Sequence, residues 1–290
     1  MKITVSENHC RALSPIYSYP LTVTRSSLPL IKSPHMLADL ALPPGKRVYF
    51  ASDFHLGAPD AATSLAREKR IVRWLDEVAR DAAAIYLLGD LFDFWFEYKY
   101  AIPRGFSRLQ GKLAELTDGG LPITIFTGNH DMWMFGYFTQ EMGIPVLRRE
   151  VSQRIGNQLF HIGHGDGLGP KDYQYKALKQ VFSSGVAQWL FARLHPNLGI
   201  GMANKWSRRS RMQTGKDDTE YFGDEEWLLQ YCRELETCRH HDYYVFGHRH
   251  LPIDVAVAPG SRYVNLGEWV NYCSYGVYDG NELALRHFEK

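Results

Sequence analysis

The chain has 290 residues, 45% hydrophobic and 22% charged, which is long enough to bury a full core. Its net charge of +1 excludes a strong overall attraction to nucleic acid or to a membrane surface. No apolar run approaches the roughly 18 residues of a membrane-spanning helix, and no secretory signal is visible, so a cytoplasmic protein is expected.

Residues 1–45 differ in pattern from the rest of the chain. They mix Ser, Thr and Pro with isolated apolar residues, which predicts a flexible extension or a loosely docked arm. Met36 stands shortly before the first predicted strand and is a candidate start of the functional chain. We expect residues 46–290 to form one domain, because the motifs described below run through it from Asp53 to His250.

Strand and helix patterns alternate over the first half of the chain. Short apolar runs predict buried strands at 47–52, 85–88 and 122–127. Amphipathic helices are predicted at 64–79 and 105–117, the first from the spacing of Leu65, Ile71, Val72, Leu75 and Val78. Such alternation is typical of crossover units on a sheet covered by helices, so an α/β fold is expected.

The pattern changes after residue 145. A hairpin is predicted at 146–162 and an acidic helix at 224–238. Further strands are predicted at 243–246, 262–266, 274–278 and 283–287, the last three antiparallel. Between them, residues 171–216 predict amphipathic helices interrupted near 196–201, with nine Lys or Arg residues against Asp172 alone. This insert is either a helical cap with a solvated basic face or a surface that meets anions.

Five loops carry polar side chains, and four of them directly follow an apolar strand. In open α/β sheets, ligands gather at the carboxyl ends of strands, so loops distant in sequence can converge on one site. Each motif alone is more often a surface or core feature, but the five together favour a shared site. The loops are Asp53-x-His55, Gly89-Asp90, Gly128-Asn129-His130-Asp131, Gly163-His164-Gly165-Asp166 and Gly247-His248-x-His250.

Seven side chains in these loops are candidate metal ligands. Carboxylate, amide and imidazole groups without a thiolate suit a metal such as Mn, Fe, Zn or Co. Their number fits two ions bridged by one carboxylate, the arrangement used for displacement at phosphorus. The candidates are Asp53, His55, Asp90, Asn129, His164, His248 and His250.

Other polar residues in the loops have candidate supporting roles. His130 can protonate a leaving group, and Asp131 is a candidate for orienting its imidazole. Asp93 and Asp166 are either hydrogen-bond acceptors behind the ligands or helix caps.

The five motifs resemble those of the calcineurin-like metallophosphoesterase family, in order and in spacing, over roughly residues 47–287. The resemblance implies a four-layer α/β/β/α sandwich and a centre of two divalent metal ions. It implies that Asp53, His55 and His250 hold one metal and that Asp90 bridges to the second. The second metal would be held by Asn129, His164 and His248, with His130 catalytic.

Within the family, the chain is most similar to a lipid A pathway subgroup of pyrophosphohydrolases that act on UDP-2,3-diacylglucosamine. The residues that carry this resemblance are 89–95, 164–168 with Asp172 and Tyr175, and 265–269. The insert at 171–216 stands where those enzymes have a helical lid. His130 is a difference, because the best-known members have Arg there, whereas His is the catalytic residue of the wider family.

The resemblance to this subgroup implies hydrolysis to UMP and 2,3-diacylglucosamine 1-phosphate, with Mn²⁺ as the expected metal. It implies peripheral contact with the inner leaflet of the membrane and no nucleic-acid partner. The expected substrate contacts are Asn129, Asp172, Tyr175 and Arg211. The alternative is a metal-dependent phosphodiesterase acting on nucleotides or nucleic acid, with the basic insert gripping a polyanion.

Overall fold

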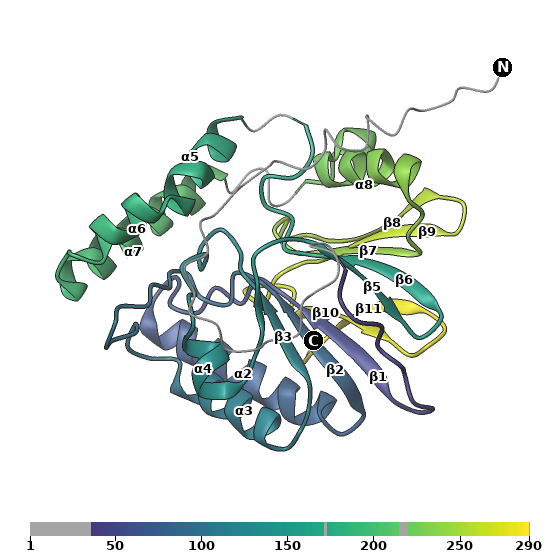
Figure 1. Ribbon diagram of the computed structural model, residues 1–290, viewed down its shortest axis with the longest axis horizontal. Helices are drawn as coiled ribbons and strands as arrows, with labels where there is room; N and C mark the ends of the chain where they lie inside the picture. The colour runs from purple at the N-terminus through teal and green to yellow at the C-terminus, as the bar shows by residue number, and fades with distance from the viewer. Residues whose placement is uncertain (1–35, 171–172, 215–219, 290) are drawn as a thin grey trace.

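The computed structural model describes residues 36–170, 173–214 and 220–289, in which two β-sheets lie face to face (Figure 1). The first sheet has the strand order β11-β10-β1-β2-β3-β4. Strands β1 to β4 are parallel, and β10 is antiparallel to both of its neighbours. The strands are β1 (Arg47–Ala51), β2 (Ala82–Leu88), β3 (Ile123–Phe126), β4 (Val146–Leu147), β10 (Ser274–Tyr278) and β11 (Leu283–His287).

The second sheet has the order β5-β6-β7-β9-β8, with β6, β7 and β9 parallel and antiparallel strands at both edges. The purely antiparallel pairing predicted for residues 262–266 is therefore wrong. Strand β8 was not predicted; it lies at the edge and turns back into β9, which re-enters the sheet beside β7. The strands are β5 (Val151–Ile155), β6 (Gln158–Ile162), β7 (Tyr243–Phe246), β8 (Pro252–Ala258) and β9 (Ser261–Leu266).

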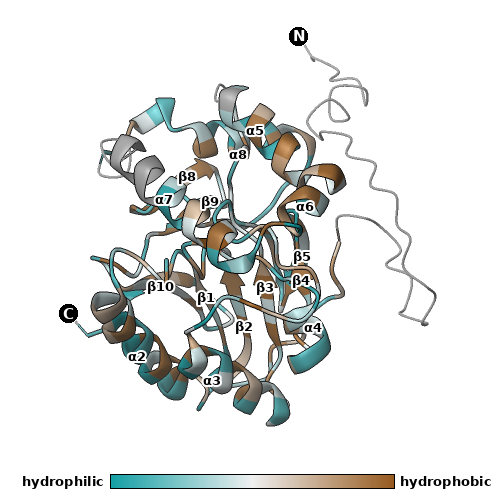
Figure 2. Cartoon of the chain, turned by 90° about the vertical axis from the view of Figure 1, so that its left-hand side faces the viewer, coloured by the Kyte–Doolittle hydropathy of each residue, from teal (hydrophilic) through white to brown (hydrophobic). Residues whose placement is uncertain are grey.

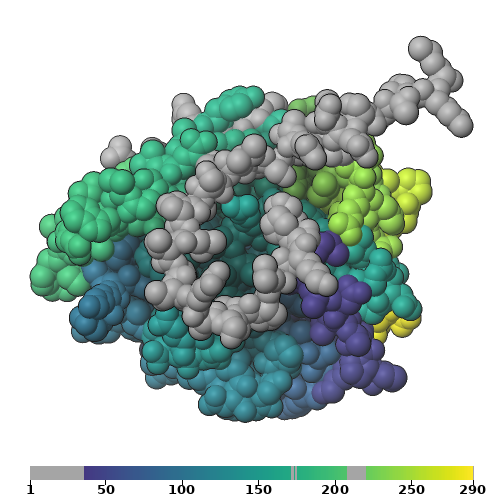
Figure 3. Space-filling view, viewed as in Figure 1, coloured from purple at the N-terminus to yellow at the C-terminus, as the bar shows by residue number. Residues whose placement is uncertain are grey.

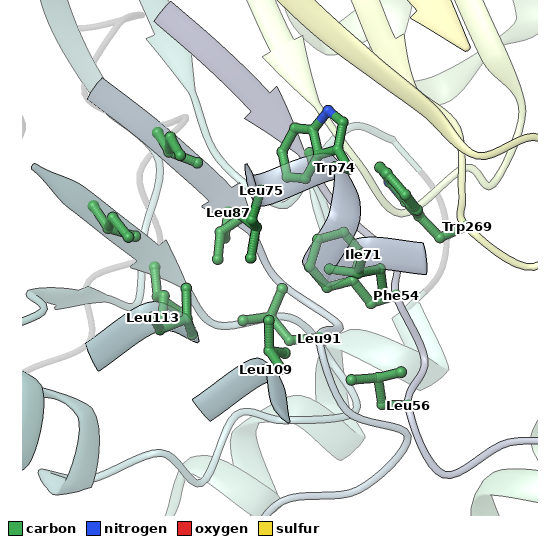
Figure 4. Packing of buried hydrophobic residues seen from close by; sticks show 14 of the residues in the cluster. Phe54, Leu56, Ile71, Trp74, Leu75, Leu87, Leu91, Leu109, Leu113 and Trp269 are labelled. Carbon is green, nitrogen blue, oxygen red and sulfur yellow. The ribbon is translucent and has the colours of Figure 1, made fainter. Parts of the chain in front are cut away.

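Helices cover the outer face of each sheet, which confirms the four-layer architecture (Figure 1). The first sheet is covered by α2 (Ala61–Val78), α3 (Ser107–Asp118) and the short α4 (Tyr137–Met142), and the second by α8 (Trp227–Cys238). Figure 4 shows Ile71, Trp74 and Leu75 of α2 packed with Phe54 and Trp269.

The face that α2 buries differs from the one predicted. Leu65 was expected on the apolar face, but it is 36% exposed, whereas Arg67 and Glu68 are each 3% exposed. Asp60 caps the helix by accepting hydrogen bonds from the N–H groups of Ala62 and Thr63, both at 2.9 Å.

Among the described residues, three hydrophobic layers separate the four structural layers: one between the helices and the first sheet, one between the two sheets, and one between the second sheet and α8. Along β1, Tyr49 and Ala51 face the helices, while Val48 and Phe50 face the second sheet. Phe50 stacks on Tyr86 from its own sheet and on Phe160 from the other, with ring centroids 5.3 and 5.8 Å apart. Because both faces are buried, the strand reads as a continuous apolar run in the sequence.

The described part of the predicted extension, residues 36–45, lies along the edge strand β5. The N–H of Leu37 donates to the carbonyl of Ser152 at 3.1 Å, and that of Leu40 donates to the carbonyl of Arg154 at 2.8 Å. Leu37, Leu40 and other apolar residues of this arm pack against the layer between the sheets. A chain that begins at Met36 would keep these contacts.

Three helices, here called the insert helices, follow β6: α5 (Tyr173–Ser183), α6 (Gly185–Phe191) and α7 (Pro196–Thr214). They form an elongated body along one side of the molecule, seen in green in Figure 3. The interruption predicted near 196–201 lies instead between α6 and α7, because Pro196 occupies the first turn of α7, where a missing N–H is tolerated. Phe191 of α6 packs on Phe96 and Trp133, which lie outside the insert; the ring centroids are 4.7 and 4.8 Å apart.

Candidate metal centre

The loops that follow β1, β2, β3, β6 and β7 meet at the carboxyl ends of these strands. All seven predicted ligands lie in these loops, and five of them have a left-handed backbone, which is uncommon for residues other than glycine. Such conformations are found where surrounding structure holds a functional side chain in place. The five φ angles are 57° at Asp53, 43° at His55, 52° at Asp90, 71° at His248 and 49° at His250.

Four of the predicted ligands form the first cluster. The Nε2 atoms of His55 and His250 are 3.0 Å apart, and the Oδ1 atom of Asp53 lies 3.6 Å from the first and 3.2 Å from the second. The Oδ2 atom of Asp90 lies 3.8 Å from Nε2 of His55. Together these groups place one potential ligand atom each within 4.8 Å of one another.

The second cluster shares Asp90 with the first. The Oδ1 atom of Asn129 lies 3.1 Å from Nε2 of His164 and 3.0 Å from Nδ1 of His248. Oδ2 of Asp90, the same atom that faces His55, is 3.5 Å from Nε2 of His164. The geometry thus places Asp90 between two ligand groups, as a bridging carboxylate requires.

The chemistry of these groups fits bound cations. Oδ1 of Asp53 and Oδ2 of Asp90 are buried carboxylate oxygens without a hydrogen-bond partner among the described residues. A buried carboxylate oxygen left in this way is costly unless a cation compensates it. His164 is oriented from behind, because its Nδ1 lies 2.7 Å from the carbonyl of Leu88. Donation there leaves Nε2 as the atom available to a metal.

The pKa values of the ligands follow from burial and mutual charge. Burial lowers the pKa values of His55 and His248 to about 4, so both imidazoles are neutral, the form that binds metals. Burial also opposes a charge on His164, but the negative charge of Asp90 outweighs it and raises the pKa of His164 to about 10. Metal binding at His164 therefore requires the loss of a proton.

Glycines allow the loops to approach one another closely. A Cβ atom at Gly128 would lie 2.2 Å from Oδ1 of Asp90, and one at Gly247 would lie 2.5 Å from Oδ2 of Asp53. No side chain fits at either distance without moving a predicted ligand. Gly128 and Gly247 are therefore required by the packing of backbone against the two carboxylates.

His130 lies beside the first cluster, with its ring centroid 5.0 Å from that of His55. Its Nδ1 is 3.1 Å from the carbonyl oxygen of Asp93 and 3.0 Å from the hydroxyl of Ser207, which comes from α7. The backbone N–H of His130 donates to Oδ1 of Asp90 at 2.8 Å. The insert helices thus contact the predicted catalytic residue directly.

The role predicted for Asp131 is wrong. Its carboxylate does not contact the imidazole of His130 but accepts backbone N–H groups: Oδ1 from Gly128 at 2.8 Å and Oδ2 from Leu91 at 2.8 Å. Burial, and then the charge of Asp90, raises the pKa of Asp131 to about 7. Asp131 therefore ties the loop after β3 to the loop after β2.

The segment 265–269, part of the resemblance noted in the sequence, supports the loops that carry Asp53 and His248. The amide Nδ2 of Asn265 donates to the carbonyl of Gly247, and the N–H of Trp269 donates to the carbonyl of Asp53 at 3.1 Å. Arg67 of α2 was missed by sequence reasoning: its guanidinium donates to the carbonyls of Phe54 and His55 at 3.0 and 2.8 Å.

The predicted substrate contacts are placed only in part. Asn129 lies in the second cluster, and the hydroxyl of Tyr175 donates to Oδ2 of Asp166, which also pairs with Lys179 at 2.6 Å. Asp166 thereby anchors α5 to the loop that carries His164. Asp172 and the side chain of Arg211 lie outside the part of the chain that the structure describes.

Two clusters of oxygen and imidazole ligands, joined by a shared buried carboxylate at the ends of parallel strands, define a dinuclear metal-dependent hydrolase. A sequence model of the calcineurin-like phosphoesterase family matches residues 46–252. The chain belongs to the calcineurin-like phosphoesterase family, as its motifs predicted.

Curated relatives extend this match. A protein of Porphyromonas gingivalis named UDP-2,3-diacylglucosamine hydrolase is 39% identical over 261 residues, which cover 84% of this chain and 98% of the relative. A protein of the same name from Shewanella baltica strain OS195 is 27% identical over 223 residues, covering 77% and 89% of the two chains.

Solved structures are more distant. A dimetal phosphatase from Danio rerio has a TM-score of 0.44 and 12% identity, covering 85% of this chain and all (100%) of that one. A zinc complex of Vps29 from Entamoeba histolytica has a TM-score of 0.38 and 14% identity, covering 82% and 89%. Among the described residues, no helix has the length and hydropathy needed to cross a membrane.

Proposed function

We propose that this protein hydrolyses the pyrophosphate bond of UDP-2,3-diacylglucosamine, giving UMP and 2,3-diacylglucosamine 1-phosphate. The observation that carries the proposal is the relative of that name, 39% identical and covered over 98% of its length, together with the paired ligand clusters that share Asp90. Asp53, His55, His250 and Asp90 would hold one divalent metal. Asp90 would also hold the second, with Asn129, His164 and His248.

When bound, the two cations supply positive charge at the phosphoryl oxygens and acidify the water molecule that attacks phosphorus. The protein's own residues position the reaction. The carbonyl of Asp93 and the hydroxyl of Ser207 hold Nδ1 of His130, which leaves Nε2 to carry a proton to the leaving group. We propose Mn²⁺ as the metal, because the resemblance to the UDP-2,3-diacylglucosamine subgroup implies it and the ligand set suits Mn, Fe, Zn or Co better than calcium or a soft metal.

The insert helices have the features expected of a lid over an acylated substrate. Figure 2 shows hydrophobic stretches along α5 and α6. Trp189 and Trp206 are 56% and 59% exposed, and the segment that contains them also carries many basic residues. Apolar side chains beside basic ones match acyl chains attached to a phosphorylated headgroup. The same composition supports peripheral contact with the cytoplasmic face of the inner membrane, where anionic headgroups attract basic residues.

A substrate comparison tests the proposed reaction. The protein, reconstituted with Mn²⁺, is assayed on UDP-2,3-diacylglucosamine, UDP-glucose, a generic aryl phosphodiester and single-stranded DNA, with Asp90→Ala as the inactive control. We expect release of UMP from the diacylated substrate with a kcat/KM at least about 100-fold above that for UDP-glucose, since a buried acyl chain contributes several kcal/mol. Equal turnover of UDP-glucose, or faster cleavage of DNA, would contradict the proposed substrate.

Membrane contact is tested separately by co-sedimentation with vesicles. A Trp189→Ser/Leu190→Ser variant should bind phosphatidylglycerol vesicles more weakly than the wild type. Leu65→Ser, which changes an exposed apolar residue on α2, is the matched control and should bind as the wild type does. Equal binding by all three proteins would contradict a role for the insert helices at the membrane.

A further inference from the structure

A buried arginine lies between the last two predicted ligands. Arg249 is 1% exposed, and the histidines on either side of it, His248 and His250, belong to different ligand clusters. Its Nε donates to Oε1 of Glu226 at 2.7 Å, and its Nη2 donates to Oε2 of the same carboxylate at 3.2 Å. Glu226 is fully buried, so the two charges form a forked ion pair inside the protein.

The same guanidinium also holds residues 220–227, here called the return segment, which lead from the insert helices into α8. Nη2 of Arg249 donates to the carbonyl of Glu220 at 2.6 Å. The guanidinium carbon lies 5.2 Å from the ring centroid of Phe222 and 4.5 Å from that of Trp227. Arg249 therefore fastens residues 220–227 to the loop that supplies two predicted ligands.

The ligand loop needs such an anchor. His248 and His250 both have a left-handed backbone, with φ of 71° and 49°. This conformation costs free energy at residues with a side chain and persists only where surrounding contacts hold it. Between these two residues, the guanidinium of Arg249 contacts Glu226 and other residues of the return segment, and these contacts tie the loop to that segment.

We infer that Arg249, held by Glu226, is a positioning residue that keeps His248 and His250 aimed at the two metals and links them to the return segment of the insert. The inference rests on the proposed function only in taking the two clusters as metal sites. It predicts that the ion pair acts on metal affinity more than on the stability of the fold.

The variant that tests this removes both charges at once. Loss of Arg249 alone would leave Glu226 buried and unpaired, which destabilises a protein strongly. Arg249→Met/Glu226→Leu instead replaces the pair with apolar side chains of similar volume, which is often neutral for stability. Arg262→Met/Asp254→Leu is the matched control, because Arg262 also makes a forked pair with a carboxylate, on the surface of the second sheet.

Mn²⁺ binding to the metal-stripped proteins is measured by titration calorimetry, and Tm is measured in EDTA. We expect the Arg249→Met/Glu226→Leu variant to bind Mn²⁺ about 10- to 100-fold more weakly, with Tm within a few degrees of the wild type. The control variant should bind Mn²⁺ like the wild type. A folded Arg249→Met/Glu226→Leu variant with affinity within about threefold of the wild type would overturn the inference.

If that double variant does not fold, Arg249→Lys decides the question. It keeps a positive charge, but its compact ammonium cannot make the forked contact with Glu226 and also reach Glu220. Weakened Mn²⁺ binding by folded Arg249→Lys supports the inference, and unchanged binding overturns it. If the wild type binds Mn²⁺ but does not hydrolyse the diacylated substrate, the proposed reaction fails and this inference stands. If the wild type binds no Mn²⁺, both fail.

Discussion

The carboxylate of Asp131 offers the most direct test of how the ligand loops are held together. It is fully buried and accepts four backbone N–H groups: Gly128 at 2.8 Å and Asp90 at 3.3 Å on Oδ1, Leu91 at 2.8 Å and Phe92 at 3.4 Å on Oδ2. Asp131→Asn keeps the shape but turns one acceptor oxygen into an NH₂ group. That group can face only the N–H groups on one side, so two buried donors lose their acceptor.

The cost follows from these distances. The short bond at 2.8 Å to a charged acceptor contributes about 1.5–3 kcal/mol, and the long one at 3.4 Å adds little. Leaving two buried N–H groups unpaired costs about 3–4 kcal/mol. Asn also removes a buried charge that burial and Asp90 disfavour, as the raised pKa of Asp131 shows, and this offsets part of the cost. We therefore expect the unfolding free energy to fall by about 1–2 kcal/mol, which lowers the Tm of a chain of this size by roughly 5 °C.

The measurement is urea unfolding of the metal-free protein at pH 8, where a group with a pKa of about 7 is ionised. Asp60→Asn is the control. Asp60 also accepts two N–H groups at 2.9 Å, but it is an exposed N-cap, where Asn serves as well as Asp, so less than about 0.5 kcal/mol is lost. If Asp131→Asn lost no more stability than Asp60→Asn, the carboxylate would not be holding the loops.

Three further predictions concern the centre itself. Asp90→Asn removes the charge shared by both clusters and should weaken Mn²⁺ binding by more than about 100-fold in calorimetry. Gly128→Ala places a Cβ 2.2 Å from Oδ1 of Asp90 and should also weaken Mn²⁺ binding, whereas Gly111→Ala, in open space on α3, should raise Tm slightly. His130→Gln should lower kcat by about 10²- to 10⁴-fold and leave Mn²⁺ affinity unchanged; a parallel loss of both would make His130 structural.

The sequence predicted which loops converge because the signals involved are local. A strand buried on both faces is visible as an uninterrupted apolar run, as at Val48 to Ala51, and the polar residues after it must lie at one edge of the sheet. This inference needs no knowledge of distant partners. The need for glycine at positions 128 and 247 is different, because it comes from Asp90 and Asp53, which lie far away in the sequence.

The role of Asp131 could not be read in the same way. Its neighbour His130 made a partnership with the imidazole plausible, but adjacent side chains in a turn point in different directions. The carboxylate instead accepts backbone N–H groups of Leu91 and Asp90, some forty residues earlier in the chain. A carboxylate whose partners are backbone N–H groups far along the chain leaves no trace in residue type or spacing.

Helix α2 shows most clearly why the partners of buried polar residues cannot be predicted from sequence. Its buried positions follow helical spacing from Ser64 through Arg67, Glu68 and Ile71 onward, yet the first half of this stripe is polar. There the helix faces loop ends instead of the sheet: Arg67 donates to carbonyls of the Asp53-x-His55 loop, and Glu68 accepts the N–H groups of Arg108 and Leu109 at the start of α3. Hydropathy assigns such residues to solvent, because it measures the side chain alone and not the unpaired backbone groups that topology brings to it.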